Sequence, residues 1–325
     1  MLEEMHGIPA HMKGQTMRIC NLHEDIAAEF REKMNEGKRI AFRRDHMNRL
    51  RQGEILTSAC VCWFRGEETY DEMTELVRLC GDEVQKRSKL ILNPEDLSEK
   101  NGDPEFFLTV EGMCGIQDHP KRRIRELYAL GVRMASLTWN EMNLLGSGVD
   151  GDPIAGLSKM GKKIVKAMNE TGMIIDVSHA NEHTFWDILR VSQKPVLASH
   201  SNCRSLCNAE RNLTDQQIVA LAEKGGIIGL NAFGKFISED PEKQGARTLA
   251  KHARHIASIV GHEHIACGFD FTDYLEEYKD IPKHDLSGAE NAQNFPAALK
   301  EEGFAEEEIL DIAYRNAYRF LKENL

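Results

Sequence analysis

The chain has 325 residues, of which 41% are hydrophobic, and its 52 acidic and 41 basic residues give a net charge of -11. A large core can therefore form, while the acidic balance and the lack of a basic block argue against nucleic acid as a partner. No apolar run reaches the roughly 18 residues of a membrane span, and the polar N-terminus lacks a signal-peptide pattern, so we expect a cytoplasmic protein without a membrane partner.

Short apolar runs, typical of buried parallel strands, alternate along the chain with segments of helical periodicity. The eight predicted strands are Met17–Leu22, Ile55–Phe64, Phe106–Val110, Val132–Leu137, Met173–Val177, Pro195–Ala198, Gly226–Leu230 and His264–Gly268. The predicted helices include Lys38–Arg51, Glu67–Ser88, Lys121–Leu130, Lys159–Glu170, Glu182–Val191, Thr214–Lys224, Arg247–Val260, Pro296–Glu302 and Glu306–Asn324. This alternation predicts an α/β protein with a closed (β/α)8 barrel of the TIM type, in one catalytic domain spanning residues 1–325.

Other fold classes and sites have less support. No G-x-G-x-x-G follows the first strand and no P-loop is present, so nucleotide binding is not expected. The eight cysteines form no C-x-x-C pair, which predicts buried free thiols in a reducing compartment rather than a zinc ribbon. His252 and His255 are expected on a polar face of their helix.

Side chains that can bind metal follow five of the predicted strands. They are His23 and Asp25 after the first strand, Glu111 after the third, His179 after the fifth, His200 after the sixth and Asp270 after the eighth. The active sites of such barrels form at these strand ends, so we expect the side chains to meet at one mouth. His23 and Asp25 are two positions apart in an extended segment, so they can bind one ion together.

Imidazole and carboxylate ligands suit two Zn²⁺ ions, and Mn²⁺ or Fe²⁺ would also accept them. Two ions about 3.5–4 Å apart can share a water and lower its pKa, giving a bridging hydroxide that attacks a carbonyl. Glu111 can bridge the ions with its two oxygens. Asp270, if it stays outside the metal shell, can take the proton and return it to the leaving nitrogen.

Short motifs at these positions match a known family. They are His23-Glu24-Asp25, Val110-Glu111-Gly112, Ile175-Asp176-Val177-Ser178-His179, Ala198-Ser199-His200-Ser201, Glu210-Arg211-Asn212 and Gly268-Phe269-Asp270-Phe271. From about Ile19 to the C-terminus the sequence resembles the membrane dipeptidase family of metallopeptidases, the renal dipeptidase-like proteins.

The resemblance implies a (β/α)8 barrel with a binuclear zinc centre, and a homodimer. It implies the ligand set His23 and Asp25 on one ion, His179 and His200 on the other, and Glu111 between them. It also implies that Arg211 binds the free C-terminal carboxylate of the substrate, as a bidentate guanidinium does well, and that Asp270 transfers protons. Asn316, in a C-terminal N-x-x-R pattern, is expected to be structural.

Two departures from the family pattern affect the prediction. Trp139 stands where the mammalian enzymes carry a histidine that contacts the substrate, and an indole cannot stabilise an oxyanion as an imidazole does. Glu24 stands between His23 and Asp25 where the family usually has asparagine, which changes the surroundings of the ligands.

These features together predict a zinc-dependent dipeptidase, with a small dipeptide as substrate and L-Xaa-D-Xaa dipeptides among the candidates. One alternative is an amide or lactam hydrolase that uses the same centre on a non-peptide substrate, which Trp139 favours. The other is a metal-bound barrel that binds a ligand without turnover. Its support is a further departure next to Asp270: the family's usual G-D-F-D-G becomes Phe269-Asp270-Phe271-Thr272-Asp273, so the second carboxylate is shifted or lost.

Overall fold

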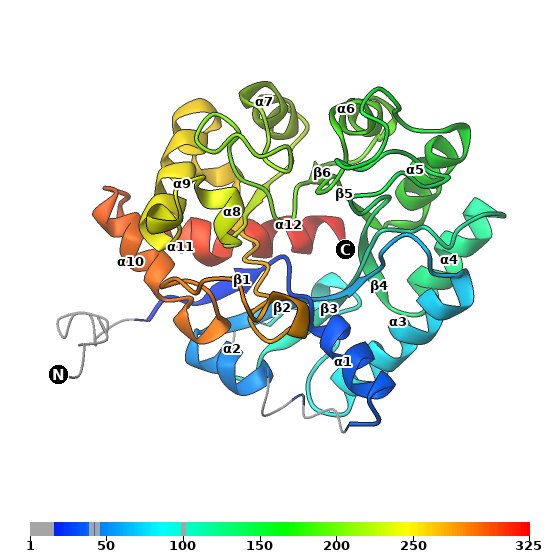
Figure 1. Cartoon of the computed structure of the whole chain (residues 1–325), viewed down its shortest axis with the longest axis horizontal. Helices are drawn as coiled ribbons and strands as arrows, with labels where there is room; N and C mark the ends of the chain where they lie inside the picture. The colour runs from blue at the N-terminus through cyan, green and yellow to red at the C-terminus, as the bar shows by residue number, and fades with distance from the viewer. Residues whose placement is uncertain (1–15, 39–41, 43–45, 99–101) are drawn as a thin grey trace.

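Eight parallel strands form the centre of the molecule in the computed structural model, which describes residues 16–38, 42, 46–98 and 102–325 (Figure 1). They are β1 Ile19–Asn21, β2 Ile55–Trp63, β3 Glu105–Glu111, β4 Val132–Ser136, β5 Ile174–Asp176, β6 Val196–Leu197, β7 Ile228–Leu230 and β8 Ile265–Cys267. Seven of them lie within a predicted strand, and β3 extends the predicted strand Phe106–Val110 by one residue at each end. All nine residues of β2 are buried, as expected for a parallel strand covered on both faces.

The sheet curls into a nearly closed barrel. Its strands pair in the order β6-β5-β4-β3-β2-β1-β8-β7, and a parallel bridge between Ala198 and Ile228 joins the two ends. At this seam the Ala198 amide donates to the Ile227 carbonyl over 3.1 Å, and the Gly229 amide donates to the Ala198 carbonyl over 2.8 Å. The predicted barrel is therefore confirmed.

Two glycines allow the backbone after β6 to pass close to β7 and β8. A Cβ at Gly229 would lie 1.9 Å from the carbonyl oxygen of Ser199, and one at Gly268 would lie 1.7 Å from it. Any larger residue would push this segment outward. The glycines thus fix the position of His200, the residue after Ser199.

Helices surround the strands in Figure 1. They are α1 Ile26–Asn35, α2 Asn48–Gln52, α3 Tyr70–Gln85, α4 Pro120–Ala129, α5 Lys159–Thr171, α6 Glu182–Val191, α7 Asp215–Glu223, α8 Gly234–Ile237, α9 Ala246–Val260, α10 Asn294–Glu301, α11 Glu306–Leu310 and α12 Asn316–Asn324. Thr214 caps α7 by accepting a hydrogen bond from the Gln217 amide, as the sequence predicts. The predicted helix Lys38–Arg51 lies partly outside the described residues, and its described end belongs to α2.

The C-terminal segment closes the other end of the barrel. Tyr314, Ala317, Tyr318 and Leu321 pack against residues of the barrel interior, such as Ala59 and Phe107. Asn316 donates to the carbonyls of His262 and Ile265, over 2.8 and 2.9 Å, where β8 begins. Its predicted structural role follows from these bonds. The predicted helix over Glu306–Asn324 is confirmed, and it contains a π-helical turn at Asp311–Arg315 between α11 and α12.

All eight cysteines are buried free thiols, as the sequence predicts. Of the helices in the described part of the chain, none has the combination of length and apolar character that crossing a bilayer requires.

Candidate metal centre

The six metal-binding side chains predicted from the strand ends meet at the C-terminal mouth of the barrel. Oε1 of Glu111 lies 2.9 Å from Nε2 of His179, 3.3 Å from Nε2 of His200 and 3.7 Å from Nε2 of His23. Nε2 of His23 is also 3.5 Å from Asp25 and 3.9 Å from Asp270, in each case to Oδ1. These atoms come from five strands or from the residues just after them. His23 belongs to two groups of three possible ligands, one with Glu111 and His200 and one with Asp25 and Asp270.

Hydrogen bonds set the orientation of two of the imidazoles. Nδ1 of His179 lies 2.6 Å from Oδ1 of Asn140, an acceptor, so this nitrogen carries the proton. Nδ1 of His200 lies 2.7 Å from the Ser199 hydroxyl, and that hydroxyl donates to Oδ2 of Asp176 over 2.5 Å. Both rings therefore present an unprotonated Nε2 to the centre, which is the form that binds metal.

The geometry leaves buried polar atoms without hydrogen-bond partners. Nε2 of His179 and Nε2 of His200 face each other at 2.9 Å, although neither carries a proton that could join them. Nε2 of His23, Oδ1 of Asp25 and Oε1 of Glu111 have no partner among the described residues. Ligand atoms about 2.0–2.1 Å from a tetrahedral ion lie roughly 3.3 Å apart, close to the separations observed here. The residues present therefore fit bound cations.

Burial governs the protonation of these groups. It raises the pKa of the Glu111 carboxyl well above its usual range and that of Asp270 to about 7. It lowers the pKa of the His179 and His200 imidazoles well below the usual value. Burial also opposes the charged form of His23, but nearby carboxylates, with Glu111 the largest influence, raise its pKa to about 10. A cation would remove this conflict, because it stabilises ionised carboxylates and binds neutral imidazoles.

Two of the six residues have a left-handed backbone. His179 has a φ of 67° and Asp270 a φ of 58°, and both follow directly after a strand or its extension. Such a conformation costs about 1–3 kcal/mol in a residue other than glycine and is concentrated at functional sites. The Asp270 carboxylate is fixed further by Asn231, whose amide donates to Oδ2 over 2.9 Å.

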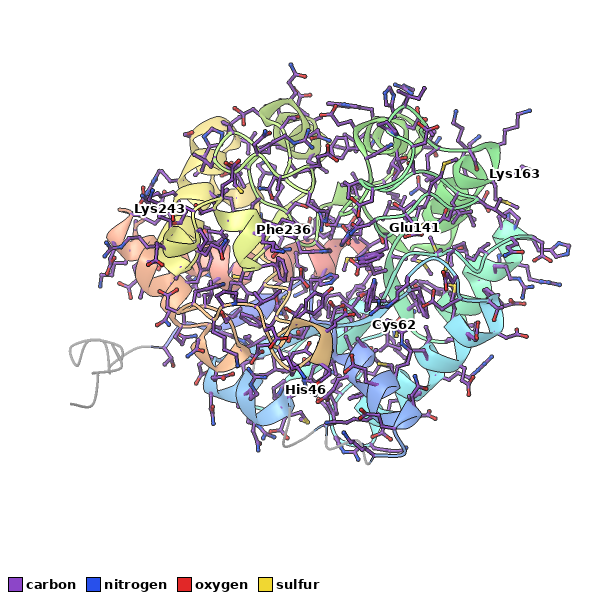
Figure 2. All side chains as sticks on the ribbon, in the orientation of Figure 1. His46, Cys62, Glu141, Lys163, Phe236 and Lys243 are labelled. Carbon is purple, nitrogen blue, oxygen red and sulfur yellow. The ribbon has the colours of Figure 1, made fainter. Side chains whose placement is uncertain are left out.

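A cavity of about 250 Å³ opens above these side chains. Besides Asp25, Glu111, His179, His200 and Asp270, its walls are Trp63, Trp139, Asn140, Phe233, Phe236, Thr272 and Tyr278. Figure 2 places Phe236 towards the middle of the molecule, whereas the ends of Lys163 and Lys243 reach its periphery. The cavity is slightly smaller than the 300 Å³ or so at which sites for drug-sized ligands begin, and its aromatic walls favour a small, partly apolar ligand.

Arg211 lies directly behind the cavity wall. Its guanidinium donates to the Ser201 hydroxyl over 3.3 Å and to the His200 carbonyl over 3.1 Å, and it lies 5.7 Å from the Phe236 ring. Its Nε has no partner among the described residues. Both hydrogen-bond acceptors are uncharged. The nearby carboxylates of Glu111, Asp270 and Asp176 favour the charged guanidinium, but none of them is hydrogen-bonded to it in the described part of the chain.

Glu24, which stands where the family usually has asparagine, forms its hydrogen bonds with residues other than the metal-binding side chains. The buried carboxylate accepts hydrogen bonds from the Asn21 amide over 2.9 Å and from the Tyr274 hydroxyl over 3.3 Å. Burial raises the pKa of Glu24 well above its usual range. The residue thus ties the end of β1 to the segment after β8.

Some residues of the site were missed by sequence reasoning. Asp176, which holds the ends of β5 and β6 together by accepting from the amides of Ser178 and Ser199, was not assigned a role. The feature of the sequence that could have indicated a role for Asp176 is its charge inside the apolar run Met173–Val177. Trp63 at the end of β2 was read only as strand, and no pattern in the sequence marks it as a cavity wall.

Comparison with known proteins places this geometry in context. The model of the membrane dipeptidase family, peptidase family M19, matches residues 11–324 of the chain. An uncharacterized Klebsiella pneumoniae protein from the pqqA 5' region is 32% identical over 249 residues, which cover 73% of this chain and 89% of that protein. An uncharacterized dipeptidase of Schizosaccharomyces pombe is 31% identical, over 82% of this chain and 66% of its own length. A dipeptidase of Claviceps purpurea is 33% identical, over 62% of this chain and 46% of its own length.

Solved structures share the fold. A metallo peptidase of Rhodobacter sphaeroides, liganded with a phosphinate mimic of the dipeptide L-Ala-D-Ala, superimposes with a TM-score of 0.83 at 20% identity, over 96% of this chain and 100% of that chain. A probable dipeptidase of Pseudomonas aeruginosa has a TM-score of 0.72 at 17% identity, over 86% of this chain and 89% of that one.

Proposed function

Because the chain belongs to the membrane dipeptidase family, peptidase family M19, we propose that it is a zinc-dependent enzyme that hydrolyses the peptide bond of dipeptides. The observation that carries the proposal is the set of six convergent donor side chains beside a small cavity, three of which have buried atoms without a hydrogen-bond partner among the described residues. Metallopeptidase chemistry follows from the family, while the number of ions, their identity and the substrate are the parts that we propose.

The donor set divides into two sites with one shared carboxylate. His23 and Asp25 would hold one Zn²⁺, and His179 and His200 would hold the other. Glu111 would be shared, since its Oε1 is close to all three imidazoles. When bound, the two ions supply a water of lowered pKa and polarise the substrate carbonyl. The hydrogen bonds that His179 forms with Asn140, and His200 forms with Ser199, keep Nε2 of both rings free to bind metal. Asp176 supports the second of these bonds by accepting from the Ser199 hydroxyl.

Asp270 moves the proton. Asn231 holds Oδ2, which leaves Oδ1 near His23 at the cavity wall. From there the carboxylate takes a proton from the attacking water and delivers it to the leaving nitrogen. Without metal, burial raises the pKa of Asp270 to about 7, and bound cations would lower this pKa towards the ionised form that accepts a proton.

Arg211 binds the carboxylate of the C-terminal residue. Its guanidinium donates only to uncharged acceptors, and its Nε has no hydrogen-bond partner among the described residues, so it can still form a charge-assisted pair with a substrate carboxylate. This selects a substrate with a free C-terminus one residue beyond the scissile bond. The phosphinate mimic of L-Ala-D-Ala on the Rhodobacter sphaeroides neighbour supports L-Xaa-D-Xaa dipeptides as a substrate class here.

A second candidate is an amide or lactam hydrolase for a non-peptide substrate. Trp139 favours it, because the indole, whose ring centroid lies 6.0 Å from that of His179, occupies a place where the family resemblance implies a histidine. The family resemblance also leads us to propose a homodimer, which light scattering on the purified protein would test.

Hydrolysis of a dipeptide panel tests the function. Zinc-loaded protein should cleave Ala-Ala in L-L or L-D form, and a chelator should abolish the cleavage. The same dipeptides with an amidated C-terminus should be poor substrates, because Arg211 then lacks its carboxylate. Two bound metal ions without cleavage of any dipeptide would refute the dipeptidase proposal and favour a non-peptide amide.

A further inference from the structure

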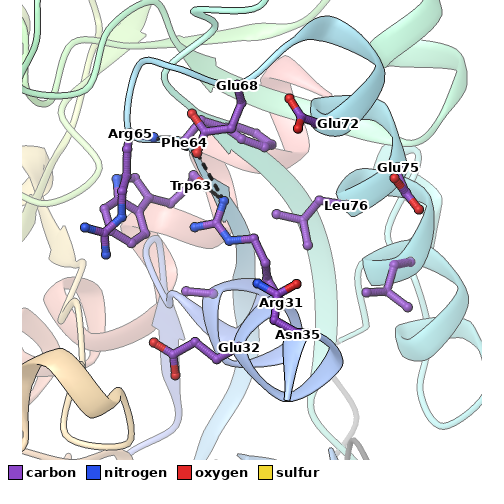
Figure 3. Close-up of a pocket in the computed structure, with 12 residues that line it drawn as sticks. Arg31, Glu32, Asn35, Trp63, Phe64, Arg65, Glu68, Glu72, Glu75 and Leu76 are labelled. Carbon is purple, nitrogen blue, oxygen red and sulfur yellow. Dashed lines mark hydrogen bonds and ion pairs between the residues drawn. The ribbon is translucent and has the colours of Figure 1, made fainter. Parts of the chain in front are cut away.

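A second cavity, of about 580 Å³, lies beside the metal-centre cavity, between α1 and α3 (Figure 3). Trp63, the last residue of β2, lines both cavities, so its indole forms a wall between them. Arg31 of α1 and Glu68 lie in the second cavity, where they form an ion pair of 3.3 Å. Five of the six metal-binding side chains, all except His23, line the first cavity.

The indole of Trp63 is held by its neighbours. The Trp139 ring packs against it edge to face, with centroids 5.0 Å apart. The guanidinium of Arg65 lies 4.7 Å from the ring centroid and that of Arg31 lies 5.6 Å from it. Arg31 also donates to the Trp63 carbonyl over 3.3 Å. With only 4% of its surface exposed, Trp63 forms a fixed wall rather than a mobile flap.

Trp63 stands across the barrel mouth from Arg211. In the strand order, β2 and β6 are four places apart, which puts them on opposite sides of an eight-stranded barrel. Arg211 follows β6 and donates to the His200 carbonyl, whereas Trp63 pairs with Glu111 across β2 and β3. The contact of 3.3 Å between Glu111 and His200 thus lies between Trp63 and Arg211. A dipeptide with its carboxylate at Arg211 and its carbonyl at the metal centre would therefore direct its N-terminal residue towards Trp63.

We propose that Trp63 ends the substrate cavity on this side and thereby limits the size of the acyl group that the enzyme accepts. The proposal rests on the dipeptidase function. In that reaction the oxygen of water bonds to the acyl carbon, the C–N bond breaks, and the nitrogen of the released amino acid takes a proton. The acyl half therefore lies on the Trp63 side, where a third residue would need the space that the indole fills.

Replacement of Trp63 by alanine tests this limit, because it would join the two cavities. The carboxylates of Glu32, Glu72 and Glu75 that line the second cavity could receive the ammonium group of a longer peptide. We would measure kcat/KM for Ala-Ala, Trp-Ala and Ala-Ala-Ala. In Trp63→Ala, the kcat/KM of each larger substrate, relative to that of Ala-Ala, should rise at least about tenfold. Changes in pocket volume can produce an effect of this size. The tripeptide should release its C-terminal alanine.

Two further variants complete the test. Trp186→Ala removes a partly buried indole on α6, outside both cavities, and should leave the substrate ratios unchanged. Trp63→Leu replaces the alanine variant if that one does not fold. Unchanged ratios in a folded, active Trp63 variant would overturn this proposal alone. A wild-type enzyme that cleaves no dipeptide would overturn the dipeptidase function as well.

Discussion

Asp270 carries the proton in the proposed reaction, although it also forms a group of possible metal ligands with His23 and Asp25. A substitution can separate the two roles. Asp270→Asn keeps the shape and can still pair with Asn231, but it cannot accept a proton. We expect kcat/KM to fall by about 10²–10⁴-fold, the usual contribution of general acid–base catalysis, while the protein retains two metal ions. Steady-state kinetics and metal analysis of the same sample check this. Loss of metal along with activity would identify Asp270 as a ligand, and full activity would refute both roles.

Some residues of the site could be identified from their neighbours in the sequence, whereas others could not. His23, Asp25, Glu111, His179, His200 and Asp270 could be found because each follows an apolar run and has metal-binding chemistry. Asp176 and Trp63 could not be assigned, since their partners are contributed by other strands and helices. Asp176 acts on Ser199, and Trp63 meets Arg31 of α1. Such pairings depend on how the strands close into a barrel.

Helix α9 contains a histidine whose environment differs from the predicted polar face. His252 is fully buried, accepts a hydrogen bond from the Cys203 amide over 3.1 Å and donates to the Ile237 carbonyl over 2.9 Å. Both bonds need the neutral ring, and burial lowers its pKa from 6.5 to about 4. The polar-face prediction is therefore wrong for His252. Helical periodicity identified the helix, but Ala250 and Ala253 next to His252 are also buried, so the inward face is wider than the apolar spacing indicates.

The low pKa of His252 predicts an acid-sensitive α9. As pH falls, the unfolded chain takes up a proton near pH 6.5, before the folded chain does at about 4. The contribution of His252 is thus complete above pH 6.5 and is lost between 6.5 and 4, by about 3 kcal/mol in total. Urea unfolding at several pH values should show a shallower loss of stability over this interval in His252→Gln, which stays neutral. Parallel curves for the two proteins would contradict the prediction.

At the scale of the molecule, the count and order of the eight strands predicted the barrel, because alternation of apolar runs with helices is a property of the whole chain. The seam between β6 and β7 was not predictable in the same way. It depends on the close approach of Ser199 to Gly229 and Gly268, and β6 is only two residues long. The closure of the opposite end by α12 depends on Asn316, whose partners lie more than 50 residues away.

The donor side chains come from β1, β3, β5, β6 and β8 and their ends, so bound metal would tie together the whole mouth of the barrel. Without metal, buried carboxylates and facing imidazole nitrogens oppose one another. A ligand present at 100 times its Kd stabilises a folded protein by about 2.7 kcal/mol, so for a chain of this length a chelator should lower the Tm of zinc-loaded protein by roughly 4 °C for each ion removed. Differential scanning calorimetry measures this. In His23→Ala, which lacks the imidazole shared by both groups of possible ligands, the chelator should lower the Tm much less. An equal response of the two proteins would show that the chelated metal is bound elsewhere.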